Sequence, residues 1–399
     1  MKCKISSEEI KPFMTFGKMP LANGFLEKEY FESEFTFEME VGFCEKLSLF
    51  QLNETPKPEQ IFGKKYPFYT GSSEYMKTHF NKFAKWLKKE FLKSNSKLIE
   101  IGSNDGTMLK NFTKTNIDYI GFEPAESVAN EALKNNIKTI NNFFTQKNIQ
   151  NLRNFKKRTD VICAANVICH VPNLKDLIVS VDELLSSNGV FVFEEPYLGS
   201  MFTKVSYDQI YDEHVFIFSL SSVKKIFDIF DFELIDAMPQ STHGGSMRYV
   251  VGRKNKHKIN TRVENGLTDE KEKKLDNIQS CLNFKESCEN SKNRVSNYLK
   301  KIKGEGKKIC GYAATSKSTT ILNYCKLSVD IIDFICDTTE EKIGKFSPGM
   351  HIPIVSVSHF HKNLPDVAYL FAWNHKDEIF SKEKEFLKKG GKWFSHVSL

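Results

Sequence analysis

The sequence lacks the features that mark membrane-spanning, secreted and disordered proteins. No apolar run approaches the roughly 20 residues that a membrane-spanning helix needs, and the opening residues MKCKISSEEIKP contain no apolar core of a signal peptide. The 9 cysteines are odd in number and scattered along 399 residues, so we expect no disulfide framework and a reducing, cytoplasmic location. A hydrophobic content of 40%, with 34 Phe and 13 Tyr, excludes a disordered chain.

The charge balance is only mildly basic. The chain has 57 Lys and Arg against 50 Asp and Glu, which leaves a net charge of +7. This excess suits an anionic small-molecule substrate and is too small and diffuse to indicate nucleic acid, so we expect neither a nucleic-acid nor a membrane partner. At roughly 150 residues per domain, the length predicts about two to three domains.

Residues 1–71 differ in pattern from the rest of the chain. Short apolar stretches such as 35–43 alternate with turn-prone pieces, which predicts a small β-rich domain. Its core has many aromatic residues available: Phe13, Phe16, Phe25, Phe35, Phe37 and Phe43.

Residues 72–255 and 256–399 each alternate strands with helices, which predicts an α/β fold with two doubly wound, parallel sheets of the Rossmann type. The second region opens with a polar stretch that has almost no core-forming residues. A long helix with Leu275, Ile278, Leu282, Val295, Leu299 and Ile302 on one face follows it. We expect a helix at 72–92 and strands at 97–101, 118–123, 160–166, 189–195, 232–239, 247–253, 307–314, 332–337, 368–373 and 392–398.

The first strand of the central region runs into a glycine-bearing loop, GSNDG at 102–106. A dinucleotide site would prefer G-x-G-x-x-G, and Asp105 would repel a pyrophosphate. An acidic loop better suits S-adenosyl-L-methionine (SAM), which carries a sulfonium and an ammonium, and a carboxylate at the end of the next strand can accept both ribose hydroxyls. An ordinary strand–helix turn is the alternative. The predicted cofactor-binding residues are Glu100, Gly102, Ser103, Asn104, Asp105, Gly106, Glu123 and Asn166.

Two segments place a histidine after a predicted strand, and one of them also has a tyrosine and a glutamate nearby. His170 follows the strand at 160–166, and Tyr211, Glu213 and His214 follow the strand at 189–195. A phenol, a carboxylate and imidazoles can take a proton from a carbon next to a ketone and stabilise the enolate that forms. The alternative is that these histidines only make hydrogen bonds in the core.

Six segments carry a resemblance to a known family. They are FGKMPLANGF (16–25), EIGSNDG (100–106), YDQIYDEH (207–214), GYAATSKSTT (311–320), SPGMHIPI (347–354) and AWN (372–374). Together and in this order they resemble the nucleotide-sugar C-methyltransferases of deoxysugar pathways. The resemblance implies a small amino-terminal domain, a central SAM-dependent methyltransferase domain and a carboxyl-terminal α/β domain that binds the nucleotide sugar.

The resemblance also implies a reaction. A 4-keto-6-deoxy sugar nucleotide would be deprotonated at C3 by His214, and the carbanion would attack the methyl group of SAM. Glu213 would raise the basicity of the imidazole, and Tyr211 or His170 would donate to the enolate oxygen. A tyrosine of the amino-terminal domain also belongs to the family's site and is placed loosely on Tyr66 or Tyr69.

The sequence departs from the family at its zinc site. Two C-x-x-C pairs normally supply four thiolates, whereas here Ser6 follows Cys3 and Leu47 follows Cys44 at the paired positions. Leucine cannot bind a metal and a serine hydroxyl is a poor zinc ligand, so we predict no metal. Asp212 is a second departure, because the family often has a further histidine there.

The carboxyl-terminal region contains a candidate diphosphate site. Ser316, Lys317 and Ser318 begin a helix after a strand, where backbone N–H groups and a lysine can hold phosphates. Asp337 resembles a nucleoside contact, and Arg248, after Gly244 and Gly245, can meet a diphosphate. Ordinary turns are the alternative reading of both segments.

Several functions remain open beside carbon methylation. The same base could serve methylation of a sugar hydroxyl or amine, and the decayed zinc site would also suit a catalytically silent sugar-nucleotide-binding protein. A hydride-transferring dehydrogenase is disfavoured by Asp105 and by the missing middle glycine.

Overall fold

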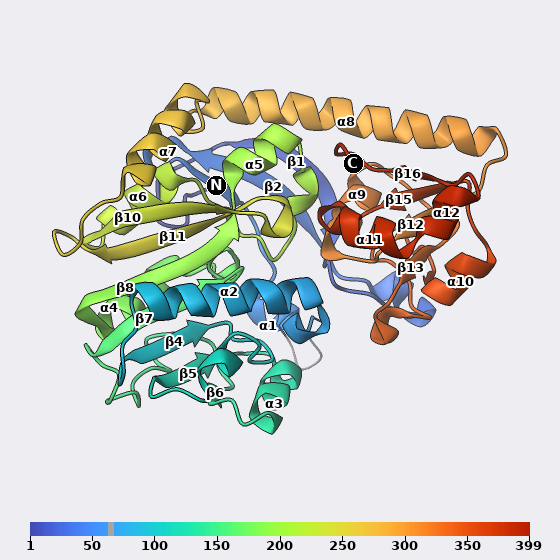
Figure 1. Cartoon of the computed structure of the whole chain (residues 1–399). Coiled ribbons are helices and arrows are strands. Elements are labelled where there is room, and N and C mark those ends of the chain that lie inside the picture. The colour runs from blue at the N-terminus through green and yellow to red at the C-terminus, as the bar shows by residue number, and fades with distance from the viewer. Residues whose placement is uncertain (63–67) are drawn as a thin grey trace.

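A computed structural model describes residues 1–62 and 68–399 of the chain (Figure 1). Three β-sheets organise these residues, and each sheet belongs mainly to one of the three regions recognised in the sequence. We propose domain limits of 1–71, 72–255 and 256–399. None of the helices in the described part of the chain is long and apolar enough to cross a membrane.

The amino-terminal sheet is antiparallel, with the strand order β1-β2-β3-β9. Its fourth strand, β9, comes from the central region and lies two residues after His214. Most of the expected phenylalanines are buried, but Phe35, which precedes β2, is 43% exposed. The strands are β1 Pro12–Pro20, β2 Thr36–Cys44, β3 Leu49–Leu52 and β9 Phe216–Ile217.

The central sheet has the order β10-β11-β8-β7-β4-β5-β6. The strands from β4 to β8 are parallel, as expected, but β11 runs antiparallel to both its neighbours. The expectation of an all-parallel sheet was wrong here, because a turn as short as η7, Thr242–Gly244, allows only an antiparallel hairpin. The strands are β4 Lys97–Ile101, β5 Asp118–Phe122, β6 Thr139–Ile140, β7 Thr159–Ala165, β8 Leu185–Pro196, β10 Phe232–Gln240 and β11 Ser246–Arg253.

Helices cover this sheet. The expected helix at 72–92 is α2, whose N-cap Ser73 accepts a hydrogen bond from the N–H of Met76. Its buried residues Met76, Phe80, Phe83 and Leu87 recur three or four apart and pack on the sheet. The helices of the first two regions are α1 Pro58–Ile61, α2 Glu74–Glu90, α3 Glu126–Lys134, α4 Leu174–Leu184, α5 Leu198–Lys204 and α6 Leu220–Asp228.

The carboxyl-terminal sheet is parallel, with the order β14-β13-β12-β15-β16. The polar stretch before it contains a helix that the sequence did not predict, α7, because Val263 and the hydrogen-bonded Glu270 are buried there. The strands and helices are β12 Ile309–Tyr312, β13 Ile335–Asp337, β14 Ile354–Ser356, β15 Val367–Leu370, β16 Lys392–Phe394, α7 Thr261–Glu272, α8 Ile278–Gly304, α9 Ser316–Tyr324, α10 Val357–Lys362, α11 Lys376–Lys382 and α12 Lys384–Lys388.

The long helix α8 runs along one side of the molecule from the central region to the carboxyl-terminal sheet (Figure 1). Leu299 and Val295 on its expected face are buried, but Leu282 is 40% exposed and Leu275 precedes the helix. One hydrophobic cluster joins Phe16 of β1, Phe284 of α8 and Ile321 of α9. The amino-terminal sheet is therefore packed against the carboxyl-terminal region.

Short 3₁₀ helices connect many of these elements, and several of them reach the site described next. They are η1 Lys28–Ser33, η2 Glu45–Leu47, η3 Thr70–Ser72, η4 Leu109–Phe112, η5 Ile168–His170, η6 Tyr207–Gln209, η8 Glu340–Lys342 and η9 Trp373–His375.

Candidate active site

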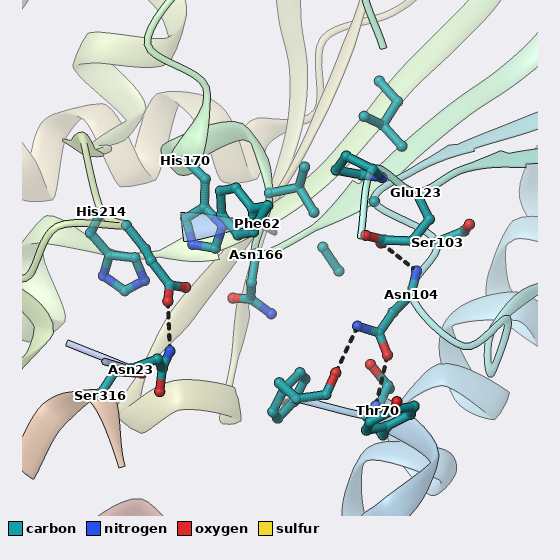
Figure 2. A pocket seen from close by; sticks show the side chains of 18 of the residues that line it. Asn23, Phe62, Thr70, Ser103, Asn104, Glu123, Asn166, His170, His214 and Ser316 are labelled. Atoms are coloured by element: carbon teal, nitrogen blue, oxygen red, sulfur yellow. Dashed lines mark hydrogen bonds between the residues drawn. The ribbon is translucent and has the colours of Figure 1, made fainter. Parts of the chain in front are cut away.

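A cavity of about 1130 Å³ lies at the carboxyl ends of strands β4, β5 and β7, where doubly wound sheets bind their ligands. All three regions contribute to its wall (Figure 2). Asn23 comes from the amino-terminal region, His170 and His214 come from the central region, and Ser316 comes from the carboxyl-terminal region.

The glycine loop after β4 forms one end of the cavity. Gly102 has a φ of +67°, and a Cβ there would lie 2.3 Å from Cγ2 of Val167. Asn104 is also left-handed, with a φ of 49°. Its side chain accepts from the N–H of Thr70 at 2.9 Å and donates to the carbonyl of Phe68 at 3.1 Å (Figure 2). The loop is thus held in one conformation against the segment that leads into α2.

Three residues that line this half of the cavity each have a buried polar atom that makes no hydrogen bond within the described chain. These atoms are Oε2 of Glu100, Oγ of Ser103 and Oδ1 of Asn166. Buried polar atoms normally have partners, so their position points to a polar ligand. Burial, with Asp105 and Glu123 nearby, raises the pKa of Glu100 well above its usual range.

Glu123 stands at the end of β5, as expected. Its two carboxyl oxygens accept from the N–H groups of Asn104, at 2.9 Å, and Ala125, at 2.8 Å. Burial raises the pKa of Glu123 to about 7, against the lowering effect of these two hydrogen bonds. The carboxylate, the hydroxyl and the amide oxygens fit a ligand that carries an ammonium and hydroxyl groups, as SAM does.

Asp105 and Gly106 lie behind the lining rather than in it. The Asp105 carboxylate accepts from the N–H of Gly71 at 2.7 Å and from Oγ1 of Thr107 at 2.6 Å. A Cβ on Gly106, whose φ is +78°, would lie 2.9 Å from Ile137. Both residues therefore shape the loop, and the expectation of direct ligand contact is not supported for them.

His214 is buried and has a protein partner on each ring nitrogen. Nδ1 lies 2.6 Å from the carbonyl of Gln209, which can only accept, so Nδ1 carries the hydrogen. Nε2 therefore has the lone pair, and the hydroxyl of Tyr211 donates a hydrogen bond to Nε2 at 2.8 Å. Burial, the largest cause, lowers the pKa of His214 well below its usual value, while the Gln209 carbonyl raises it. The ring is therefore neutral near pH 7.

His170 lies beside His214, with the ring centroids 5.3 Å apart and the rings stacked. Phe62 covers it at a centroid distance of 5.6 Å. Its Nε2 is buried and has no hydrogen-bond partner among the described residues. Burial lowers the pKa of His170 to about 3, so this ring is also neutral.

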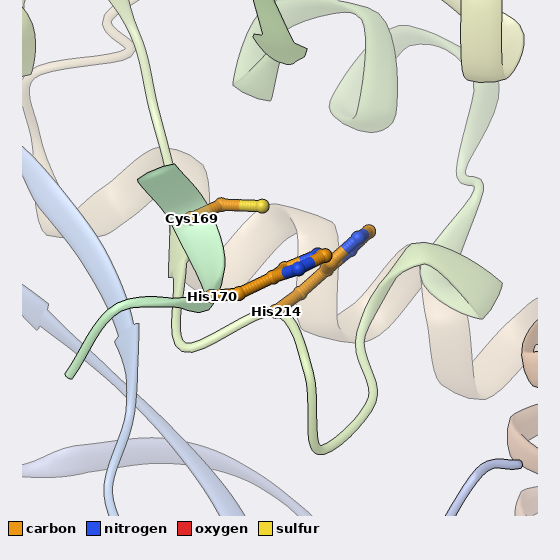
Figure 3. A group of neighbouring side chains, drawn as sticks. All are labelled: Cys169, His170 and His214. Atoms are coloured by element: carbon orange, nitrogen blue, oxygen red, sulfur yellow. The ribbon is translucent and has the colours of Figure 1, made fainter. Parts of the chain in front are cut away.

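Cys169, His170 and His214 together form a group whose residue types could bind a metal (Figure 3). Their ligand atoms lie within 4.8 Å of one another. Burial and the neighbouring Glu195 raise the pKa of the Cys169 thiol far above its usual range, and both nitrogens of His214 already have partners. A metal ligand must be a thiolate, and the Cys169 thiol keeps its proton, so the group does not fit metal binding.

The carboxylates beside His214 are held by the PLANG turn of the amino-terminal region. The N–H of Ala22 donates to Asp212 at 3.0 Å, and the side-chain amide of Asn23 donates to Glu213 at 2.6 Å. Burial and the adjacent Glu213 raise the pKa of Asp212 to about 8. This contact places the segment 16–25 at the site and makes Asn23 a lining residue that the sequence did not single out.

The four residues at the expected zinc-ligand positions lie in the amino-terminal region: Cys3, Ser6, Cys44 and Leu47. The hydroxyl of Ser6 lies 3.6 Å from Sγ of Cys44, and the N–H of Ser6 donates to Sγ of Cys3 at 3.4 Å. Leu47 is buried in the hydrophobic core with them. Two thiols, a hydroxyl and an isobutyl group do not fit a tetrahedral zinc site, so the expectation of no zinc stays a prediction.

The start of α9 forms the opposite end of the cavity. Ser316 and Lys317 line it, and Nζ of Lys317 lies 3.3 Å from Oδ1 of Asn374 and 5.0 Å from the Trp373 ring. Ser318 is fully buried and donates to the carbonyl of Thr315, so it supports the helix start instead of lining the cavity.

Asp337 also supports this end from behind the lining. It accepts from the N–H groups of Ala314, at 2.6 Å, and Thr339, at 2.7 Å, and so shapes the loop before α9. Lys342, which the sequence did not single out, lines the cavity and donates to the Ala314 carbonyl at 2.7 Å.

Arg248 lies away from the cavity, contrary to the expectation that it meets a diphosphate. Its Nε donates to the buried carboxylate of Glu194 at 2.6 Å, and its guanidinium stacks on Phe83 and Trp86. His79 holds the other oxygen of Glu194 at 2.6 Å. The arginine is therefore used to neutralise a buried carboxylate.

The tyrosine expected from the amino-terminal region is only partly placed. Tyr69 lines the cavity, whereas Tyr66 lies outside the described residues. His243 lines the cavity as well, with a left-handed φ of 52° and a buried Nε2 that has no partner in the described chain. The neighbouring Gly244 and Gly245 indicate a turn here, but they do not indicate that the His243 side chain lines the cavity.

Three family models match the chain in the order of its three regions. A zinc binding domain model matches residues 3–62, a methyltransferase domain model matches residues 74–237, and a C-methyltransferase C-terminal domain model matches residues 241–397. The C-methyltransferase NovU of Streptomyces niveus is 27% identical over 383 residues, which are 95% of this chain and 91% of the relative.

Solved structures are similar to part of the chain, at lower identity. The plantazolicin methyltransferase BpumL in complex with SAH is 16% identical, covers 44% of this chain and 82% of its own, and has a TM-score of 0.36. The magnesium protoporphyrin IX methyltransferase of Synechocystis PCC 6803 with bound SAM is 12% identical, covers 49% of this chain and 89% of its own, and also has a TM-score of 0.36.

The central fold, its ligand cavity and the methyltransferase domain match define a SAM-dependent methyltransferase. The carboxyl-terminal domain model and the full-length likeness to NovU narrow this class. In all three regions the chain is similar to C-methyltransferases, and its amino-terminal region matches a zinc binding domain model although Ser6 and Leu47 stand at two of the expected ligand positions.

Proposed function

We propose that the chain methylates carbon C3 of a nucleotide-linked 4-keto-6-deoxy sugar. The observation that carries the proposal is the Tyr211–His214 pair, which lies in a cavity bounded by the glycine loop at one end and by the start of α9 at the other. One end suits SAM and the other suits a diphosphate, so the pair stands between the two ligands that the reaction needs.

His214 is the proposed base. A proton next to a ketone is acidic enough for removal by a neutral imidazole, and the depressed pKa keeps His214 neutral at physiological pH. Its Nδ1–H is committed to Gln209, so only Nε2 can take the proton. The Gln209 carbonyl then stabilises the protonated ring.

Tyr211 and His170 are the proposed partners of the enolate oxygen. Tyr211 has an O–H directed at the base, and His170 has a ring nitrogen with no partner in the described chain. Preorganised donors at the position where charge develops are usually the largest catalytic contribution. SAM supplies the electrophilic methyl group, and because positive and negative charge disappear together, exclusion of water from the reacting groups favours the transfer.

Diphosphate binding is proposed for Ser316 and Lys317 at the start of α9, supported by the lysine and the helix start in the cavity wall. SAM binding is proposed for Glu100, Gly102, Ser103, Asn104, Glu123 and Asn166. We further propose a cytoplasmic location with no nucleic-acid or membrane partner, which the nine free cysteines support.

Product analysis tests the proposal. The purified protein is incubated with SAM and a panel of 4-keto-6-deoxy nucleotide sugars, and the sugar products are examined by mass spectrometry and NMR. We expect one product heavier by a methylene group, with the new methyl on C3. A methyl on oxygen or nitrogen would contradict carbon transfer, and an unchanged panel with intact SAM binding would contradict the proposed substrate class.

A further inference from the structure

Asp208 is a buried carboxylate of the central region that contacts two residues of the carboxyl-terminal region. It lies in η6, six residues before His214, and its side chain is fully buried. The indole N–H of Trp373 donates to Oδ2 at 2.7 Å, and Nε2 of His396 lies 3.0 Å from Oδ1. Both partners belong to the carboxyl-terminal region, and the cavity lining contains neither them nor Asp208.

The partners of Asp208 are themselves fixed. The Tyr369 hydroxyl lies 3.1 Å from Nδ1 of His396, and the guanidinium of Arg294 donates to the His396 carbonyl at 2.6 Å. The groups facing Asp208 are His396, Lys317 and Trp373, which together hold its pKa below the usual range despite burial. A buried carboxylate needs such partners, and removing one is costly.

The residues after Asp208 connect this cluster to the base. The Gln209 carbonyl accepts from Nδ1 of His214, and the Ile210 carbonyl accepts from Oγ1 of Thr320 at 2.8 Å. Thr320 belongs to α9, and its neighbour Thr319 donates to the Ala22 carbonyl at 2.8 Å. The segment that orients His214 is therefore held from the carboxyl-terminal region, largely by α9.

The first turn of the same helix lines the cavity. Nζ of Lys317 lies 5.0 Å from the ring of Trp373, and Trp373 is the residue whose indole N–H donates to Asp208. A Cβ on Gly244 would lie 2.0 Å from the Trp373 ring, so the indole is pressed against the hairpin that carries His243. A ligand that engages Lys317 would act on Trp373 and, through it, on η6.

We propose that Asp208 is a positioning residue through which a nucleoside diphosphate bound at Lys317 sets the orientation of His214. The proposal rests on the proposed function, because it takes the diphosphate of the substrate as the ligand of α9. Binding of the nucleotide then increases kcat as well as affinity, because the energy of a remote contact aligns the base.

Two variants and a matched control test the coupling. Trp373→Phe removes the donor to Asp208 and keeps an aromatic ring, and Asp208→Asn removes the charge. Trp393→Phe is the control, since Trp393 is in the same region and its indole nitrogen is buried without a partner in the described chain. We expect kcat to fall about 100-fold in Trp373→Phe, with SAM affinity unchanged, and to change little in Trp393→Phe.

A spectroscopic measurement separates positioning from general damage. The ring ¹⁵N signals of His214, assigned by their loss in His214→Gln, are followed while uridine, thymidine, guanosine and cytidine diphosphates are titrated into the full chain. We expect the signals to shift on binding in the wild type and in Trp393→Phe, and to stay fixed in Trp373→Phe. Asp208→Asn serves as the second variant if Trp373→Phe does not fold.

The outcomes distinguish this proposal from the proposed function. A diphosphate that binds without moving the His214 signals overturns the coupling alone. If none of the four diphosphates binds, the coupling and the nucleotide subsite are both overturned. An equal loss of kcat in Trp373→Phe and Trp393→Phe would also overturn the role given to Asp208.

Discussion

The hydroxyl of Tyr211 lies 2.8 Å from Nε2 of His214, while Nδ1 of the same ring lies 2.6 Å from the Gln209 carbonyl. These two contacts determine which nitrogen carries the hydrogen and which holds the lone pair. The lone pair on Nε2 of His214 is directed at the phenol of Tyr211, and both residues line the cavity. A base therefore lies next to a proton donor.

Replacing His214 with Gln keeps a polar side chain of similar reach and removes the base. We expect kcat to fall by about 10²- to 10⁴-fold, as for loss of a general base, with little change in SAM affinity measured by calorimetry. His359→Gln is the control, because His359 is exposed and lies outside the cavity. Retained turnover in His214→Gln would show that another group removes the proton.

SAM affinity should depend on pH through Glu123. Its pKa of about 7 means that the carboxylate form gains population as the pH rises from 6 to 8, and that form attracts the cationic ligand and accepts hydroxyl hydrogens. Affinity should therefore increase over this range in calorimetric titrations. Glu123→Gln should bind SAM more weakly and with a flatter pH profile, whereas the exposed Glu126→Gln should match the wild type. A falling affinity would contradict this role.

Gly102 should not tolerate a side chain. Ala would place its Cβ 2.3 Å from Val167 in a left-handed backbone, so we expect a loss of about 1–3 kcal/mol of stability and weaker SAM binding. Gly304→Ala has open space around the new Cβ and should change neither. Thermal unfolding and SAM titration of both variants check this, and equal behaviour of the two would refute the close approach.

The amino-terminal domain should be stable without zinc. The two thiols, the hydroxyl and Leu47 supply no tetrahedral ligand set, and the phenylalanine core joins this domain to α8 and α9. Treatment with a strong chelator should leave the unfolding temperature unchanged, and metal analysis should find no stoichiometric zinc. One zinc per chain with a lowered Tm after chelation would show that the remaining ligands suffice.

Much of the fold could be predicted because its strands are buried apolar runs. KLIEI and DYIGFE were placed within a residue of β4 and β5. The position of β11 between β10 and β8 and the pairing of β9 with β3 could not be predicted, because both depend on which strands meet in space. The helix α7 was not predicted because only two of its residues are buried, Val263 and Glu270, and one of these is charged. The Glu270 carboxylate accepts from the Ser221 N–H.

The site was predictable where one motif carries the chemistry. His170, His214, Tyr211 and Glu213 all line one cavity, because strand ends and the loops after them meet at one edge of the sheet. Arg248 could not be placed from the sequence, since its partner Glu194 is on a neighbouring strand. His243 was overlooked because a lone histidine in a turn gives no signal of its own.

Exchange of the sugar C3 hydrogen in D₂O tests the central claim most directly. The enzyme is incubated with S-adenosylhomocysteine, which has no methyl group to give, and with each 4-keto-6-deoxy nucleotide sugar of the panel, and the sugar is followed by proton NMR. The account predicts loss of the C3 signal with the wild type and with His359→Gln, and its persistence with His214→Gln. A substrate that is methylated in the presence of SAM but keeps its C3 hydrogen under these conditions would contradict deprotonation by His214.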